Sequence, residues 1–266
     1  MNSLREHLIL EGFSPRTVES YVHAISQLNT RIVKINDNVL LDHKEWLIGH
    51  FSARTANARI AAINTYLDHI GYQGIRLKSF KIQQRPFLEN VIGRADYERL
   101  RDGTLRDGML FWHFTVRYLA CTGARVSEFR RFEVDHARLG CMDLRTKGDK
   151  IRRVYIPQEL CADTMEWVGA LNKEEGPLFA GKNGKVMTSR GVSMGLKRIA
   201  KRYGVSPDLV YPHSFRHFFA KSFIKNNPDI SLLSDLLGHG SIETTRVYLR
   251  RTAEEQREAV NLAVDW

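Results

Sequence analysis

The stretch from Tyr211 to Leu249 constrains the fold of this chain most, because proline and glycine divide it into predicted helices. Pro212 has a backbone conformation suited to the first turn of a helix. An apolar run of leucines follows, and Gly238 stands where helices commonly end in the left-handed conformation. Ser241 can cap the next, short helix. The stretch therefore predicts three helices with closely spaced ends.

Four side chains of this stretch suit chemistry on a phosphodiester: His213, Arg216, His239 and Tyr248. His213 and Arg216 are three residues apart on the first helix, so they share a face. A tyrosine hydroxyl, with a pKa of about 10, is a weak nucleophile at neutral pH. It can attack phosphorus if cations neutralise the non-bridging oxygens and a neighbour accepts its proton. A guanidinium suits phosphate, and histidines exchange protons near neutral pH.

The upstream sequence supplies a second arginine and an acid. Arg125 lies in the motif T-G-A-R-V-S-E, at a break after the apolar run 109–119, and Glu128 can orient its guanidinium. Lys147 immediately precedes Gly148-Asp149, a two-residue hairpin signal between two short predicted strands. The lysine is therefore expected at the lip of a β-hairpin, where it can reach into a groove.

These motifs carry a resemblance to a known family. The segments T-G-A-R-V-S-E, T-K-G-D-K-x-R, H-S-F-R-H and L-L-G-H-G-S-I-x-T-T-x-x-Y occur in this order. The order, and the nine-residue spacing from His239 to Tyr248, resemble the phage-integrase family of tyrosine recombinases. The resemblance covers essentially the whole chain.

The resemblance implies six catalytic residues, one of which, the tyrosine, is the nucleophile. In the family, the two arginines hold the scissile phosphate and the lysine protonates the leaving 5′ oxygen. The first histidine assists as a general base, and the second hydrogen-bonds the phosphate. The tyrosine forms a 3′-phosphotyrosyl bond. The corresponding residues here are Arg125, Lys147, His213, Arg216, His239 and Tyr248.

The implied activity is site-specific DNA recombination by strand cleavage and rejoining, giving integration, excision, inversion or resolution. No metal, ATP or other cofactor is expected. The implied partner is double-stranded DNA, bound by a homotetramer on two duplexes. The chain resembles the simple Xer-like or integrase-like kind. Because Met1 lies close to the first predicted helix, no arm-binding domain is expected.

Composition fits this interpretation. Hydrophobic residues make up 43% and charged residues 26% of the 266-residue chain, as in a globular protein. The net charge of +10 favours a polyanionic partner, although a merely basic protein is the alternative. Cys121, Cys141 and Cys161 form no C-x-x-C pair and are expected to be reduced. With no signal peptide or membrane span in the sequence, a cytoplasmic, nucleoid-associated protein of a bacterium, archaeon or phage is expected.

The sequence predicts a mainly α fold with a small β-sheet. Residues 1–75 form a helical, SAM-like core-binding domain, residues 76–92 a linker, and residues 93–266 an α+β catalytic domain. Helix starts are predicted at Ser3, which forms a capping box with Glu6, at Ser14-Pro15, at Asp42 and near Arg54. Short strands are predicted over 141–146 and 152–156, with a third suggested at 178–179, and a helix over 189–203.

Two basic groups are candidates for further DNA contacts. The first lies near the start of the fourth predicted helix, and the second on the helix 189–203. In each group the alternative is an ordinary solvated helix face, because sequence does not distinguish the two. The residues are Arg54, Thr55, Asn57 and Arg59, and Lys197, Arg198, Lys201 and Arg202.

The chain ends in a predicted amphipathic helix, from Thr252 to Trp266. Its apolar face is expected to dock on a neighbouring protomer, with docking on its own domain as the alternative.

Two other functions remain open. A type IB topoisomerase uses a similar residue set without strand exchange, and a DNA-binding regulator could retain these motifs without catalysis. A zinc site is disfavoured, because the pair His213 and His217 has no evident third ligand.

Overall fold

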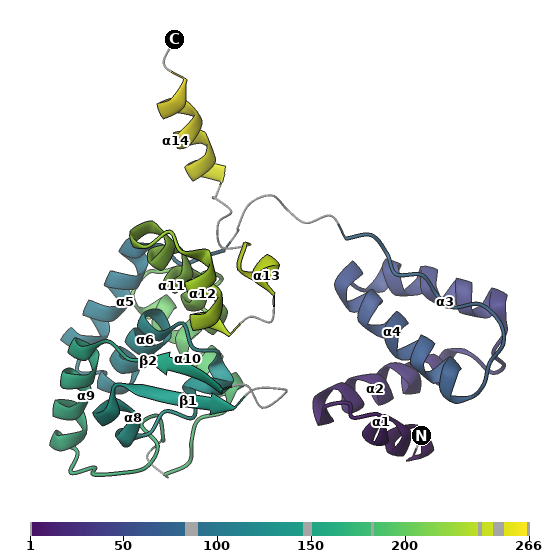
Figure 1. The fold of residues 1–266 in the computed structure, drawn as a ribbon, viewed down its shortest axis with the longest axis horizontal. Helices are drawn as coiled ribbons and strands as arrows, with labels where there is room; N and C mark the ends of the chain where they lie inside the picture. The colour runs from purple at the N-terminus through teal and green to yellow at the C-terminus, as the bar shows by residue number, and fades with distance from the viewer. Residues whose placement is uncertain are drawn as a thin grey trace. The chain divides into compact units, whose positions relative to one another are not determined.

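The computed structural model describes residues 2–82, 90–145, 151–181, 184–238, 241–246 and 253–264. The chain forms two compact units, Met1–Gln84 and Arg85–Trp266, each with its own hydrophobic core. Both units are built from helices, and the second also contains a two-stranded sheet (Figure 1). The expected mainly α fold with a small β-sheet is confirmed. Among the described helices, none combines the length and apolar character of a membrane span.

The first unit consists of α1 (Asn2–Leu10), α2 (Pro15–Arg31), α3 (Asp37–His50) and α4 (Ala53–His69). The last three helices begin at polar caps. The side chains of Ser14, Asn36 and Ser52 accept hydrogen bonds from backbone N–H groups of the first turn. One apolar stripe from each helix meets in the core, which includes Leu8, Ile25, Leu28, Leu40, Leu47, Ile60, Ile63 and Leu67.

The segment after α4 packs back onto this unit. The side-chain amide of Asn64 exchanges two hydrogen bonds with the backbone of Leu77, and that of Asn57 does the same with Phe80. Leu77 is buried in the core. Residues 76–80, expected in a linker, therefore pack onto the first unit, where two asparagines satisfy the backbone groups of Leu77 and Phe80.

Two predicted helix starts in the first unit are wrong. Ser3 lies inside α1, which already includes Asn2, and its hydroxyl is 3.2 Å from Nε2 of His69. Asp42 lies inside α3, because the helix begins five residues earlier with Asn36 as its cap. Beginning there places Leu40 on the helix face that enters the core. The predictions at Ser14-Pro15 and near Arg54 are confirmed within one residue.

The second unit contains ten helices among its described residues, and one β-hairpin lies between α8 and α9. The elements, in order, are α5 (Arg94–Arg106), α6 (Leu110–Thr122), α7 (Val126–Phe129), α8 (Val134–Leu139), β1 (Cys141–Arg145), β2 (Ile151–Tyr155), α9 (Gln158–Ala170), α10 (Ser189–Arg202), α11 (Pro212–Asn226), α12 (Ile230–Leu237), α13 (Ile242–Arg246) and α14 (Ala253–Ala263).

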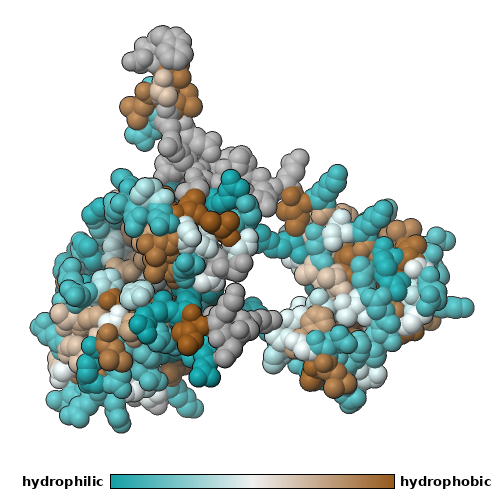
Figure 2. Space-filling model, viewed as in Figure 1, coloured by the Kyte–Doolittle hydropathy of each residue, from teal (hydrophilic) through white to brown (hydrophobic). Residues whose placement is uncertain are grey.

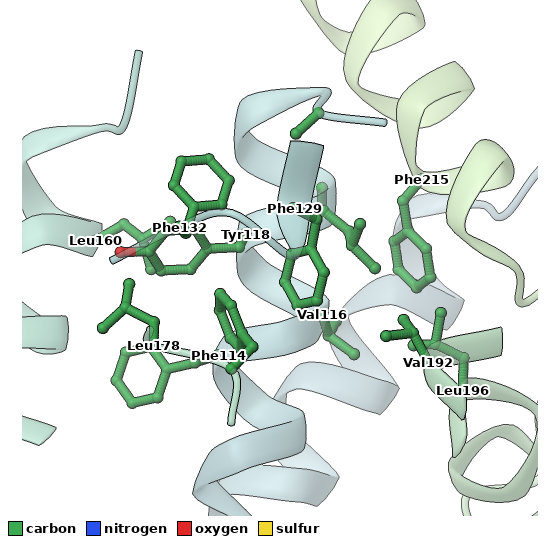
Figure 3. Packing of buried hydrophobic residues seen from close by; sticks show 14 of the residues in the cluster. Phe114, Val116, Tyr118, Phe129, Phe132, Leu160, Leu178, Val192, Leu196 and Phe215 are labelled. Carbon is green, nitrogen blue, oxygen red and sulfur yellow. The ribbon is translucent and has the colours of Figure 1, made fainter. Parts of the chain in front are cut away.

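Helix α6 runs through the core of the second unit, where it packs against α5, α9 and α11. Its buried aromatic side chains meet those of other elements (Figure 3). The Tyr118 and Phe132 rings lie edge to face with centroids 4.9 Å apart, and Phe114 stacks on Trp167 at 4.4 Å. Each fully buried large apolar side chain contributes about 1.5–3 kcal/mol to folding. This core holds both ends of α6 in place, and the C-terminal end leads to Arg125.

The two strands pair antiparallel, with Cys141 opposite Tyr155 and Arg145 opposite Ile151. The predicted hairpin is confirmed, although its turn lies outside the described residues. Residues 178–179 form no strand. They are buried core residues next to two isolated bridges, Glu133 with Pro177 and Ala180 with Val186.

The visible surface of both units is mostly hydrophilic, with apolar side chains in separate patches (Figure 2). Helix α14 confirms the predicted C-terminal helix. Its described apolar side chains Val260 and Leu262, like Val264 just beyond it, are exposed.

The packing of the Trp112 side chain of α6 against Gly195 of α10 gives a stability prediction. A Cβ atom at Gly195 would lie 1.8 Å from Cη2 of Trp112, a contact that requires the Trp112 ring or the backbone to move. We expect Gly195→Ala to lower the free energy of unfolding of the second unit by about 1–3 kcal/mol, the usual effect of overpacking. Urea denaturation followed by circular dichroism would measure this change.

The matched control is Gly169→Ala, in α9 of the same unit. A Cβ atom there meets nothing within 4 Å, and alanine favours a helix over glycine by up to about 1 kcal/mol. We expect this variant to be at least as stable as the parent. Equal stability of the two variants would contradict the packing at Gly195.

Candidate active site

Arg125 lies at the turn between α6 and α7. Helix α6 ends at Gly123, whose φ of 60° is the left-handed conformation. An added Cβ atom at Gly123 would also lie 2.5 Å from Cδ1 of Phe219 in α11, so this turn approaches α11 closely. Arg125 then caps α7. The turn therefore directs Arg125 away from the axis of α6.

Glu128 orients Arg125, as the sequence predicts. Nη1 of Arg125 donates to Oε1 of Glu128 at 2.7 Å, and the backbone N–H of Arg125 donates to Oε2 at 2.7 Å. Nη2 of Arg125 donates to the carbonyl of Gly238 at 3.1 Å. The side chain remains 39% exposed, so a ligand can reach it.

Helix α11 carries His213 and Arg216, with Pro212 in its first turn as predicted. Arg216 is 1% exposed. Its Nη1 donates to the carbonyl of Gly123 at 2.8 Å, and its Nη2 donates to the carbonyl of Leu237 at 2.6 Å. Arg216 therefore links the end of α6 to the end of α12.

The two predicted phosphate-binding arginines meet at the end of α12. They bind carbonyls of consecutive residues, Leu237 and Gly238, although they come from different elements. A helix C-terminus carries partial negative charge, so guanidinium groups are favourable there. Gly238 has a φ of 62°, which confirms its predicted role in ending the helix.

His213 lies one turn before Arg216. Desolvation of its ring lowers its pKa from the ordinary value of 6.5, and the charges of Arg216 and Arg125 lower it further. The three side chains are therefore within electrostatic range of one another. A neutral imidazole at pH 7 can accept a proton, as a general base must.

His217, one turn further along α11, is a neighbour of His213. The two rings lie edge to face with centroids 4.6 Å apart. Burial lowers the pKa of His217 to about 4, and the charges nearby lower it as well. Within the described part of the chain, no group of three or more His, Cys, Asp or Glu side chains could hold a metal ion.

Three of the six predicted catalytic residues lie outside the described residues: Lys147, His239 and Tyr248. Lys147 belongs to the segment between β1 and β2, and His239 follows Gly238, the C-cap of α12. Ser241 caps α13, as predicted, by accepting a hydrogen bond from the backbone of Glu243. Tyr248 comes two residues after the end of that helix.

The candidate DNA contacts of the first unit lie in α4. Arg54 and Thr55 are exposed, and Thr55 Oγ1 is 3.0 Å from Oγ of the cap Ser52. Asn57 uses its amide to hold Phe80, and the Arg59 guanidinium stacks 4.0 Å above the Phe51 ring. Asn57 and Arg59 therefore have structural contacts, and DNA binding by these four residues stays a prediction.

The second group of candidates lies along α10. Lys197, Arg198, Lys201 and Arg202 are all exposed, and Arg202 forms an ion pair with Asp107 at 2.8 Å. Their role in DNA binding also stays a prediction.

The sequence analysis missed one residue of this region, Arg152 in β2. Its side chain is buried and donates from Nη1 to Oε1 of Glu128 at 2.7 Å. Alternation along β2 was the available signal, since Arg152 and Val154 occupy the inward-facing positions of the strand.

The environment of His213 gives a pH prediction. Because its pKa is lowered, we expect the imidazole to stay neutral as pH falls through 6.5 and to protonate only at lower pH. Two-dimensional NMR of the ring C–H signals, assigned with His213→Gln, would measure the midpoint. Arg125→Gln removes a nearby positive charge and should raise the midpoint. Arg153→Gln, on the exposed face of β2, should leave it unchanged, and a midpoint above 6.5 in the parent would contradict this environment.

Comparison with known proteins identifies the family. A model of the phage integrase family matches residues 103–255. Tyrosine recombinase XerA of Pyrococcus furiosus is 28% identical over 269 residues, which cover 97% of this chain and 91% of the relative. Tyrosine recombinase XerH of Campylobacter jejuni is 27% identical over 273 residues, which cover 99% of this chain and 72% of the relative.

Solved structures share the fold. The integrase of transposon Tn1549, in complex with transposon right end DNA, has a TM-score of 0.73 at 17% identity. The match covers 100% of this chain and 99% of the Tn1549 integrase chain. A lambda integrase dimer bound to a COC′ core site has a TM-score of 0.71 at 16% identity, covering 92% of each chain. The family match extends from α5 to α14, over more than half of the chain. This protein therefore belongs to the phage integrase family of tyrosine recombinases.

Proposed function

We propose that this family member, a site-specific DNA recombinase, cleaves and rejoins DNA strands through a 3′-phosphotyrosyl bond to Tyr248. The observation that carries the proposal is the meeting of Arg125 and Arg216 at the end of α12, within electrostatic range of His213. A tyrosine can attack a phosphodiester when guanidinium groups neutralise the phosphate oxygens and a neutral imidazole accepts the tyrosine proton.

In the proposed reaction, the Tyr248 oxygen attacks phosphorus and the bond to the 5′ oxygen breaks. Arg125 and Arg216 neutralise the charge that develops on the non-bridging oxygens. His213 accepts the tyrosine proton, and Lys147 donates a proton to the leaving 5′ oxygen. His239 hydrogen-bonds the phosphate.

The second step reverses the first with a different strand. A 5′ hydroxyl of the partner duplex attacks the phosphotyrosine, forms a new phosphodiester and releases Tyr248. One phosphate ester is exchanged for another in each step, so the scheme needs neither ATP nor another cofactor.

Double-stranded DNA is the proposed partner, and several structural neighbours were solved in complex with their DNA substrates. The excess positive charge of the chain supports a polyanionic partner. Action on chromosomal or phage DNA would take place in the cytoplasm of the host.

Strand exchange requires two duplexes, so we propose a homotetramer in which α14 docks on the neighbouring protomer. The exposure of Val260 and Leu262 supports this use of α14. Recombination by a chain cut after Thr252, if it remains folded, would contradict the proposed docking.

Two other activities have distinct signatures. A type IB topoisomerase would relax a supercoiled plasmid without a recombination site, whereas a recombinase requires paired sites. A DNA-binding regulator would bind DNA without forming any covalent adduct. A suicide substrate from the genomic neighbourhood of the gene would trap a covalent adduct with either enzyme and none with the regulator, and the plasmid test then separates the two enzymes.

Tyr248→Phe tests the nucleophile. The substitution keeps the ring and removes only the attacking oxygen, so we expect DNA affinity to be retained and covalent attachment to be lost. Gel shift measures the affinity, and a denaturing gel detects the adduct. An adduct formed by this variant would mean that another residue is the nucleophile.

Lys147→Ala tests the general acid. A sulfur leaving group needs little protonation, so a 5′-bridging phosphorothiolate should restore cleavage to this variant. On the normal substrate we expect a loss of about 10²–10⁴-fold, the usual contribution of general acid catalysis. Single-turnover rates on the two substrates provide the comparison. Equal losses would assign Lys147 to binding instead.

A further inference from the structure

Arg152 has an unusual position for an arginine in a two-stranded hairpin. Its side chain is only 4% exposed, whereas that of the next residue, Arg153, is 50% exposed. The two residues point to opposite sides of β2, as alternation requires. Arg153 forms an ion pair with Asp143 across the hairpin at 2.7 Å. Arg152 instead turns toward the candidate active site.

Its contacts join two parts of that site. Nη1 donates to Oε1 of Glu128 at 2.7 Å, and Nε donates to the carbonyl of Leu236 at 2.9 Å. Nη2 is buried, and among the residues that the structure describes it has no hydrogen-bond partner. Burying a guanidinium group is costly even when it is paired, unless its remaining donors are also satisfied, and here Nη2 is not satisfied by any described residue. Stability alone therefore does not explain the placement.

Glu128 is the first part that Arg152 contacts. Its Oε1 accepts from both Arg152 and Arg125. Burial alone would raise the pKa of Glu128. The charge of Arg152, together with the hydrogen bonds from Arg125 and Arg152, outweighs burial and holds that pKa below its ordinary value. The carboxylate is therefore ionised and shared by the two guanidinium groups. The position in which Glu128 holds one of them depends on its contact with the other.

The end of α12 is the second part. The carbonyls of Leu236, Leu237 and Gly238 accept hydrogen bonds from Arg152, Arg216 and Arg125 respectively. A Cβ atom at Gly238 would lie 2.3 Å from Cδ of Arg152, so the arginine packs directly against this glycine. The predicted phosphate ligand His239 is the next residue in the sequence.

We propose that Arg152 is a positioning residue, which holds the Glu128–Arg125 pair and the end of α12 in the arrangement that places cationic groups around the scissile phosphate. The role rests on the proposed function. Arg152 acts through Arg125 and through the segment leading to His239, and it does not itself touch the substrate.

The test compares two DNA substrates that differ in charge at one phosphate. The first is a suicide substrate with the protein's own recombination site, and the second carries a neutral methylphosphonate at the scissile position. A methylphosphonate lacks the negative charge that the arginines neutralise, so its cleavage depends less on their placement. Single-turnover adduct formation is measured at saturating protein, and gel shift gives the affinity.

We expect Arg152→Met to slow cleavage of the phosphodiester by roughly tenfold to a hundredfold, the scale of a small misplacement of catalytic groups. On the methylphosphonate the loss should be small, and DNA affinity should stay near that of the parent. Arg153→Met is the matched control on the same strand and should behave as the parent on both substrates. An equal loss on both substrates, or no loss on either, would overturn the role of Arg152.

Circular dichroism establishes whether each variant is folded. If Arg152→Met does not fold, Arg152→Lys replaces it in the same comparison. A lysine keeps the charge, but its single ammonium group does not reproduce the two contacts of the guanidinium. The parent and Tyr248→Phe are measured beside these variants. Absence of an adduct with the parent would overturn the recombinase mechanism and this role together. If the parent and the Arg152 variant form the adduct at the same rate, this role alone is overturned.

Discussion

The candidate active site depends on how the carbonyl groups at the end of α12 are satisfied. A helix leaves its last carbonyls without intrahelical partners, and a buried carbonyl without any partner costs about 1–3 kcal/mol. Here three successive carbonyls accept from three arginines, which come from β2, α11 and the turn after α6. One helix end therefore joins three elements that are far apart in sequence. The guanidiniums gather there only when all three elements are folded.

The same arrangement determines the charge of the site. Two guanidiniums share the single carboxylate of Glu128, which leaves an excess of positive charge. Arg216 adds another cation, and desolvation of the His213 ring together with the nearby charges lowers the pKa of His213, which favours its neutral form. Charges that are already in place need no reorganisation when negative charge develops on a phosphate. The aromatic core around α6 provides the rigid support for this arrangement.

Much of the local structure was predictable from the sequence, because helix ends have local chemistry. Ser14-Pro15, Pro212, Gly238 and Ser241 all mark helix ends as expected. The prediction at Asp42 failed although aspartate is a good capping residue. Asn36 is equally suitable, and starting the helix there brings Leu40 into the core. Packing decided between two caps that local chemistry does not distinguish.

The sequence by itself determined the residue types, their order and their spacing. These indicate a tyrosine nucleophile assisted by cationic side chains. Reactivity of this kind belongs to the side chains, so it can be read without coordinates. Only the tertiary structure decided that Arg216 is buried, that Asn57 holds the segment after α4, and that Arg152 turns inward. Arg152 binds residues 24 and 84 positions away. No local pattern encodes such contacts, because burial of a side chain depends on which distant segments fold against it.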